Sequence, residues 1–116
     1  MQIQLEAHET HTIQAYSHTE IKINHIAYDS NFIISRDTLI TPWVLQDSLN
    51  LILDLKPEIL IFGTNTPDFL RRSDIIRQFA EKQIGVECMA RDAACRTFNL
   101  LLSEHRRVVA GFLFEN

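Results

Sequence analysis

The chain has 116 residues, of which 46% are hydrophobic, and this supplies enough apolar surface for the core of one domain of ordinary size. Charged residues make up 22% and there are only three glycines and three prolines, a composition that excludes disordered and fibrous proteins. The net charge of −4 is unevenly spread, because residues 1–70 carry nine acids and three bases whereas residues 71–107 carry five acids and eight bases. In this basic part acids and bases alternate at helical spacing, which indicates a solvated helix face and predicts no nucleic-acid ligand.

The start of the chain, residues 1–6, has no basic segment and no apolar run, and no stretch approaches the ~20 apolar residues that cross a bilayer. We therefore expect a cytoplasmic protein without a transmembrane segment. The two cysteines, Cys88 and Cys95, are too few for a disulfide framework, so both are predicted to be reduced and buried. The five histidines lack the spacing of metal ligands, and neither a metal nor a cofactor is expected.

The N-terminal third of the chain is predicted to contain strands. Residues 1–12 show no pattern and are expected to be loosely ordered, whereas residues 13–116 are expected to form a single domain. From Ile13 onward short apolar runs at 21–23, 26–28 and 32–34 are separated by turn residues, which predicts two to four antiparallel strands.

A first helix is expected to follow these strands. Thr41 and Pro42 have the residue types of an N-cap and a first-turn proline, and the helix should end before Pro57. Its buried stripe repeats at i, i+4 and i+7 (Leu45, Leu49, Ile52).

The C-terminal half alternates strands and helices. Residues 59–62 are apolar at every position, which is typical of a strand covered on both faces and predicts the central strand of a sheet. A second helix with Thr66 or Ser73 as its cap should end at Gly85, because glycine commonly terminates helices. A short strand, a third helix and a last strand are predicted at 86–89, 92–103 and 108–114 respectively.

This element order predicts an α/β fold. Right-handed crossovers place helices against a central sheet, so we expect a three-layer domain with a mixed central sheet flanked by helices and with N-terminal antiparallel strands. The N-terminal strands either extend the sheet or fold over one of its edges, and the pattern does not distinguish the two.

The C-terminal segments 84–89, 93–101 and 104–108 (IGVECM, AACRTFNLL and EHRRV) resemble the signature of the Mth-type family, a family of domains of unknown function. The resemblance extends upstream through 59–64 and 41–43 to the strands near Ile13. The family includes a mitochondrial complex I assembly factor and the adipogenesis-associated Mth-type protein. The resemblance therefore implies a three-layer fold and a role in protein assembly, and it supplies no catalytic residues.

Several positions depart from the family pattern. Asn65 replaces a second glycine of the turn, and His105 replaces a glycine before the arginine pair. Ala90 and Arg91 replace an Asp-Thr pair whose threonine would cap the third helix, which leaves Asp92 as the cap. The resemblance therefore does not imply a site built from those backbone amides in this chain.

Two segments are predicted to meet at one edge of the sheet. The turn Gly63, Thr64, Asn65 leaves a buried strand and opens a helix, where backbone N–H groups can hold an anion. The third helix follows a parallel strand, so its start should lie at the same edge. One interpretation is a structural turn, with glycine needed for backbone reasons, beside polar groups that bind loop carbonyls. The other is a ligand site, whose residues would be Gly63, Thr64, Asn65, Arg91, Arg96 and Asn99.

Two further side chains have alternative interpretations. Cys95 lies near a helix start with Arg91 and Arg96 beside it, which suits a nucleophile, but no histidine is placed to act as its base. A buried structural thiol is the favoured interpretation. Trp43 is interpreted as a core anchor, with an interface contact as the alternative.

The leading functional hypothesis is a non-enzymatic binding or assembly module that acts through contacts with a protein partner. Its predicted interface residues are Trp43, Arg71 and Arg72, and the oppositely charged parts of the chain would also allow a homodimer. The alternative is a small-molecule or anion-binding protein, conceivably an enzyme, with a crevice between the Gly63 turn and the helix start near Asp92.

Overall fold

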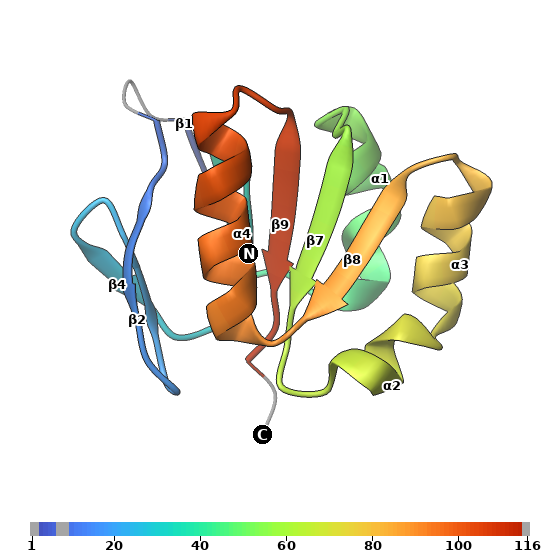
Figure 1. Cartoon of the computed structure of the whole chain (residues 1–116), viewed down its shortest axis with the longest axis horizontal. Helices are drawn as coiled ribbons and strands as arrows, with labels where there is room; N and C mark the ends of the chain where they lie inside the picture. Colours follow the sequence, from blue (N-terminus) through green and yellow to red (C-terminus); the bar gives the residue numbers. More distant parts are fainter. Residues whose placement is uncertain (1–2, 7–9, 115–116) are drawn as a thin grey trace.

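The computed structural model describes residues 3–6 and 10–114. Within these ranges the chain forms a six-stranded mixed sheet, a separate three-stranded antiparallel sheet, and helices on both faces of the larger sheet (Figure 1). The predicted α/β architecture with a mixed central sheet, flanking helices and N-terminal antiparallel strands is confirmed.

The larger sheet has the strand order β1-β6-β5-β9-β7-β8. Its C-terminal part is parallel, with Ile61 in register with both Glu87 of β8 and Ala110 of β9, so the three apolar runs of the C-terminal half lie side by side as predicted. The predicted central strand is interior but lies second from one edge. The strands are Ile3–Glu6 (β1), Phe32–Ile34 (β5), Thr38–Thr41 (β6), Ile59–Gly63 (β7), Gly85–Met89 (β8) and Val108–Phe112 (β9).

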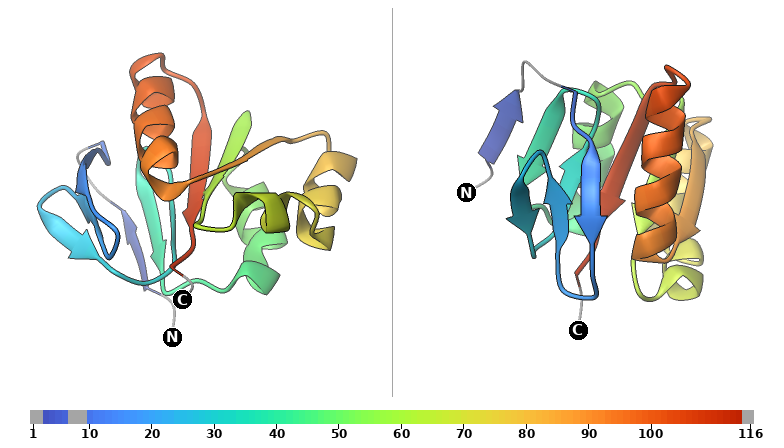
Figure 2. Two further views of the ribbon diagram at one scale, coloured as in Figure 1. Left: turned by 60° about the horizontal axis from the view of Figure 1, so that its bottom comes forward. Right: turned by 60° about the vertical axis from the view of Figure 1, so that its left-hand side comes forward.

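The smaller sheet covers part of one face of the molecule. It consists of β2 (Ile13–Tyr16), β3 (Ile21–Ile23) and β4 (Ile26–Tyr28), and β2 lies beside helix α4 (Arg91–Ser103) (Figure 2). Both placements considered for the N-terminal strands therefore occur, because β5 and β6 extend the main sheet whereas β2 to β4 form a layer of their own.

The main sheet is buried on both faces. Leu60 and Phe62 of β7 pack into a core with the helices α1 (Ser48–Asp54), α2 (Pro67–Arg71) and α3 (Asp74–Glu81). Ile61, between them, packs into a second core with α4 and the small sheet. This two-sided burial explains why residues 59–62 are apolar without alternation. Each fully buried side chain of this size contributes roughly 1.5–3 kcal/mol.

The N-terminal segment is more ordered than its sequence indicates. Ile3–Glu6 form β1, which pairs antiparallel with β6, and His11 is 4% exposed with its Nδ1 hydrogen-bonded to the carbonyl of Ser35. The expectation of loose order over residues 1–12 did not anticipate this strand or the burial of His11. The backbone edge of β6 supplies the hydrogen bonds that hold β1, and no local pattern reveals such a partner. Residues 1–2 and 7–9 lie outside the described part.

The first helix begins later than predicted. Thr41 is not a helix cap but the last residue of β6, and its hydroxyl donates to the carbonyl of Asn31. The peptide bond between Thr41 and Pro42 is cis. A 3-10 turn over Leu45–Asp47 (η1) precedes α1.

The predicted second helix is two helices. α2 and α3 are separated at Ser73, whose extended backbone interrupts the helical path. α3 ends at Glu81, and the left-handed residue that follows is Gln83 (φ 63°), so Gly85 does not terminate the helix but begins β8.

Trp43 belongs to the core. Its side chain is 2% exposed and its ring stacks on that of Phe62, with a centroid distance of 6.0 Å and an interplanar angle of 7°. The ring lies over Gly111 of β9. The core interpretation of Trp43 therefore holds, and the interface interpretation is wrong because the ring is not accessible to a partner.

The space around Gly111 gives a test of this packing. A Cβ at residue 111 would lie 2.7 Å from Trp43 Cη2 and 2.9 Å from Phe62 Cε1, whereas a Cβ at Gly85 would meet nothing within 4 Å. Overpacking of this kind costs about 1–3 kcal/mol. We expect Gly111→Ala to lower the free energy of unfolding in urea by that amount and Gly85→Ala to leave it unchanged or raise it slightly. Equal effects of the two substitutions would contradict the packing described.

Candidate functional site

A pocket of about 520 Å³ lies at the carboxyl ends of β7 and β8. Three segments line it: residues 64–65 after β7, residues 90–92 at the start of α4, and residues 16–18 at the turn between β2 and β3. In Figure 1 the arrowheads of β7 and β8 point to the end of the molecule where these loops lie. The structure therefore brings together Thr64, Asn65 and Arg91 of the predicted site.

Arg91 connects two segments of the pocket, the start of α4 and the β2–β3 turn, and it also holds the end of β9. Its guanidinium donates from Nη1 to the carbonyl of Leu113 at 3.0 Å and from Nη2 to the carbonyl of His18 at 3.1 Å. The same group lies over the ring of Phe114, with Cζ 5.0 Å from the ring centroid. Arg91 thus ties the β2–β3 turn and the end of β9 to the first turn of α4.

Two other predicted site residues contact the small sheet and do not line the pocket. Arg96 donates from Nη1 to the hydroxyl of Tyr16 at 3.0 Å and lies 3.8 Å from the carboxylate of Asp92. Asn99 forms a pair of hydrogen bonds with the backbone of Ile13, accepting from its N–H at 3.1 Å and donating to its carbonyl at 2.8 Å. Asn99 therefore acts as an additional strand partner for β2, as the scaffold interpretation expects.

The Gly63 turn is held by the sheet itself. Gly63 has no positive φ, but a Cβ there would lie 2.8 Å from both Ala94 Cβ and Phe112 Cδ1, so glycine is needed for close packing and not for the backbone conformation that was predicted. Thr64 is fully buried, and its N–H donates to the carbonyl of Met89 at 3.0 Å. The N–H of Thr66 donates to Thr64 Oγ1 at 3.1 Å. These two backbone N–H groups are therefore bonded within the protein rather than directed at an anion.

Both cysteines are free and buried. Burial, reinforced by the Asp92 carboxylate and opposed by Arg96 and Arg91, raises the pKa of the Cys95 thiol to about 12. Burial also raises the pKa of Cys88. Thiols with raised pKa values are poor nucleophiles at neutral pH, which agrees with the structural interpretation of Cys95.

The turn between β2 and β3 is the part of the pocket that the sequence did not predict. Ser17 accepts hydrogen bonds at its Oγ from the N–H groups of Thr19 and Glu20, which fixes a tight polar turn. Such a turn is visible in the sequence as Ser-His-Thr between two alternating runs. Its position beside the start of α4 depends on contacts between residues that lie 73 and 80 positions apart along the chain, which no local pattern indicates.

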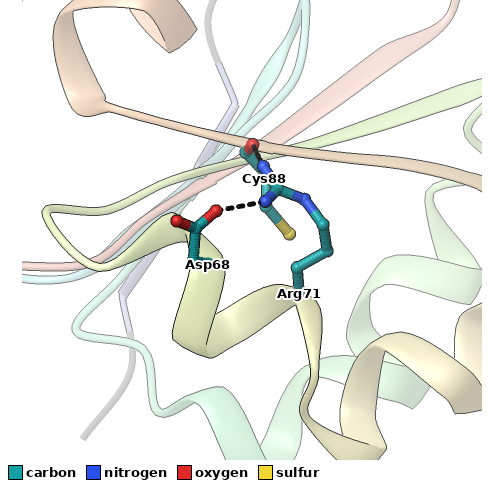
Figure 3. A network of polar contacts seen from close by, with 3 residues as sticks. All are labelled: Asp68, Arg71 and Cys88. Atoms are coloured by element: carbon teal, nitrogen blue, oxygen red, sulfur yellow. Dashed lines mark hydrogen bonds and ion pairs between the residues drawn. The ribbon is translucent and has the colours of Figure 1, made fainter.

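The two arginines predicted at an interface lie at the end of α2. Arg71 forms an ion pair with Asp68 and donates from Nη2 to the carbonyl of Cys88 at 2.8 Å, so it fastens α2 to the edge strand β8 (Figure 3). Arg72, the helix C-cap residue, has an exposed side chain. One turn earlier Phe69 is 79% exposed, the highest value among the large hydrophobic residues in the described part of the chain.

The described residues give two further findings on metals and membranes. Within residues 3–6 and 10–114 no three His, Cys, Asp or Glu side chains gather as metal ligands. The longest helix in the same ranges has 13 residues, and none of the helices there has the length and apolarity needed to cross a membrane.

The pair of hydrogen bonds between Asn99 and Ile13, which we call the Asn99 bridge, can be tested by substitution. Asn99→Ala removes both hydrogen bonds to Ile13 and leaves a partly buried N–H and carbonyl unpaired, which costs about 1–3 kcal/mol. We expect the free energy of unfolding to fall by this amount and amide exchange in β2 and β3 to accelerate. Asn50→Ala on the exposed side of α1 is the matched control, and an equal loss there would show that the bridge is not responsible.

The pKa of Cys95 predicts a dependence of stability on pH. The folded state holds this proton more tightly. In the unfolded chain the pKa of the thiol is ~8.5. The stabilisation is therefore complete below pH ~8.5 and is lost as the pH rises toward about 12. We expect the free energy of unfolding to fall with pH above ~8.5, with a slope from this group that approaches ~1.4 kcal/mol per pH unit. Cys95→Ala should show a shallower slope in urea unfolding at pH 8 to 10.5, and an unchanged slope would contradict the assignment.

Known proteins with curated descriptions resemble this chain. It is 42% identical over 65 residues to the "13 kDa major membrane protein" of Francisella tularensis, a match that covers 56% of this chain and 53% of that protein. The chain thus spans about half the length of that relative. It is also 27% identical over 124 residues to NADH dehydrogenase [ubiquinone] 1 alpha subcomplex assembly factor 3 of the zebrafish Danio rerio, covering 96% of this chain and 68% of that protein.

Solved structures share the fold. A solution structure from Xanthomonas campestris has a TM-score of 0.73 and 28% identity, covering 90% of this chain and 85% of that one. A Mth938-like domain from Bordetella pertussis has a TM-score of 0.65 and 24% identity, and the match covers 89% of this chain and 85% of that one. The family described as "Protein of unknown function (DUF498/DUF598)" matches residues 13–113. The resemblance to Mth-type domains is therefore confirmed, and this chain belongs to the DUF498/DUF598 family.

Proposed function

We propose that this chain is a non-enzymatic binding module that acts through contacts with a protein partner, in the manner of an assembly factor. The observation that carries the proposal is the exposed ring of Phe69 on α2. The similarity to an assembly factor over nearly the whole chain supports the same class of function. The pairing of an aromatic side chain with arginines is typical of residues that dominate protein interfaces.

The α2 surface, which we define as Asp68, Phe69, Arg71 and Arg72, is a preorganised platform. Arg71 is bonded both to Asp68 and to the carbonyl of Cys88, so α2 is held against β8. A contact side chain on a fixed helix loses less conformational entropy on binding than one on a mobile loop. Phe69 would enter an apolar pocket of the partner, and Arg72 would face an acidic rim beside it.

The cellular location and self-association belong to the same proposal. The protein would act in the cytoplasm, where its two buried thiols stay reduced. A second copy of the chain is an additional partner that the charge asymmetry favours, since residues 1–70 are acidic and residues 71–107 are basic. Sedimentation in low and high salt would reveal such a dimer, because screening weakens contacts between opposite charges.

The α2 surface can be tested by affinity capture from the source cell. We expect Phe69→Ala to reduce recovery of the partner at least tenfold, as truncation of an aromatic anchor costs ~2 kcal/mol or more. The tagged wild type and the variant are compared by quantitative mass spectrometry. Because Phe69 is 79% exposed, the substitution should leave the thermal midpoint unchanged.

Leu100→Ala is the matched control. Leu100 is 58% exposed and lies on α4, so the variant also removes a large apolar side chain from the surface but leaves α2 intact. It should recover the partner as the wild type does. Recovery of the same proteins in the same amounts by wild type and Phe69→Ala would refute a role for the α2 surface.

The pocket at the ends of β7 and β8 supports a second candidate function, the binding of a small molecule. Its volume of about 520 Å³ lies within the ~300–1,000 Å³ of typical small-molecule sites. The pocket lies at the start of α4 and the α2 surface lies on another element, so the two functions are separable by substitution.

A further inference from the structure

The pocket occupies the point where the crossovers of the parallel strands diverge. After β7 the chain enters α2 and α3, which contribute Leu70 and Phe79 to the core on one face of the sheet. After the neighbouring strand β8 it enters α4, which contributes Cys95 and Phe98 to the core on the opposite face. Adjacent parallel strands whose connections leave toward opposite faces open a crevice at their carboxyl ends, and open α/β sheets bind ligands in such crevices. The structure places the pocket at this point.

The β2–β3 turn closes the third side of this crevice. It is fastened there by the bond from Arg91 to the carbonyl of His18 and by the bond from Arg96 to the hydroxyl of Tyr16. The bridge between Asn99 and Ile13 fixes the other end of β2. Walls that are already held in place by hydrogen bonds do not have to be ordered when a ligand binds.

The charged side chains that line the pocket are Arg91 and Asp92, and in the described part of the chain only Asp92 has an oppositely charged partner outside the pocket, Arg96. Arg91 lines the pocket, and its two hydrogen-bond acceptors are neutral main-chain carbonyls. Asp92 also lines it, but its carboxylate accepts from the N–H of Ala93 at 2.8 Å and lies 3.8 Å from Arg96. An anion beside Arg91 would offset the guanidinium charge where surrounding protein excludes part of the solvent, which strengthens the attraction.

The size and the lining of the pocket indicate that its ligand contains more than a charged group. A volume of about 520 Å³ is more than a bare carboxylate or phosphate group fills. The ring of Tyr16, at the end of β2, and the methyl group of Ala90, just before α4, provide apolar surface in the lining of the pocket. The ligand therefore needs a planar or apolar body as well as a charged group.

We propose that this pocket binds a small molecule with a carboxylate or phosphate group at Arg91 and an aromatic or apolar body against Tyr16 and Ala90. The proposal rests on the second candidate function and names the ligand class of that site. It is independent of the α2 surface, so its failure leaves the protein-contact function untouched.

Backbone amide shifts in ¹⁵N NMR spectra test the ligand class with three matched probes. Benzoate and phenyl phosphate carry the two charged groups, and benzamide has the same ring without charge. We expect benzoate or phenyl phosphate to shift the amides of residues 16–18, 64–65 and 90–92 in a saturable manner, more weakly as NaCl is raised. Benzamide should bind at least tenfold more weakly. The stronger of the two charged probes identifies carboxylate or phosphate as the natural group.

Three variants assign the charged group to Arg91. Arg91→Gln should weaken binding of the charged probe at least tenfold, whereas Arg91→Lys, which keeps the charge, should lose less. Arg107→Gln is the control, because Arg107 also donates to a main-chain carbonyl, that of Lys56, but lies before β9 at the opposite end of the sheet. It should bind like the wild type.

Four results would overturn the proposal. Equal binding of benzamide and benzoate would be consistent with a small-molecule site but would show that the ligand needs no negative charge. Equal losses in Arg91→Gln and Arg91→Lys would show that the guanidinium acts by holding the β2–β3 turn and not by its charge. Shifts scattered over the surface, or no saturation with any probe, would reject the pocket as a binding site and with it the second candidate function.

Discussion

Helix α4 lies so close to the end of β7 that residue 63 has no room for a side chain, and the rest of the molecule depends on this contact. A Cβ there would collide with Ala94 and Phe112. The approach sets the start of α4 beside the turn after β7, which creates the crevice. It also fixes the face of α4 that carries Arg96 and Asn99, and that face holds the small sheet. One glycine therefore links the packing of the parallel strands to the position of a layer that begins fifty residues earlier in the chain.

The parallel core was predictable because burial on both faces leaves a clear pattern. Residues 59–62 are apolar throughout, and apolar residues recur at helical spacing over 92–103, so the strand and the helix follow from the sequence alone. The elements that were misplaced depend on distant partners. β1 exists because β6 offers it hydrogen bonds, and Thr41 continues that pairing instead of capping a helix. The break at Ser73 likewise lacks the glycine or proline that usually reveals one.

The candidate site was predictable only on the side that the sheet topology determines. The segments after β7 and β8 were expected at one edge, and Thr64, Asn65 and Arg91 line one pocket. The third wall, residues 16–18, comes from an antiparallel hairpin whose docking depends on buried isoleucines and on side-chain hydrogen bonds from α4. Arg96, which was expected in the site, donates to the hydroxyl of Tyr16 and does not line the pocket. Sequence patterns report which residues are buried, but they do not report which polar side chain finds which distant partner.

The hydrogen bond from Arg71 to the carbonyl of Cys88 affects whether the edge strand β8 can pair with a strand of another molecule. β8 ends the strand order of the main sheet, and an outermost strand with open carbonyl and amide groups can recruit a strand from another molecule. Here a guanidinium already occupies one of those carbonyls and places a positive charge along the border. An incoming strand would have to displace this guanidinium, which disfavours pairing at the β8 edge near Cys88.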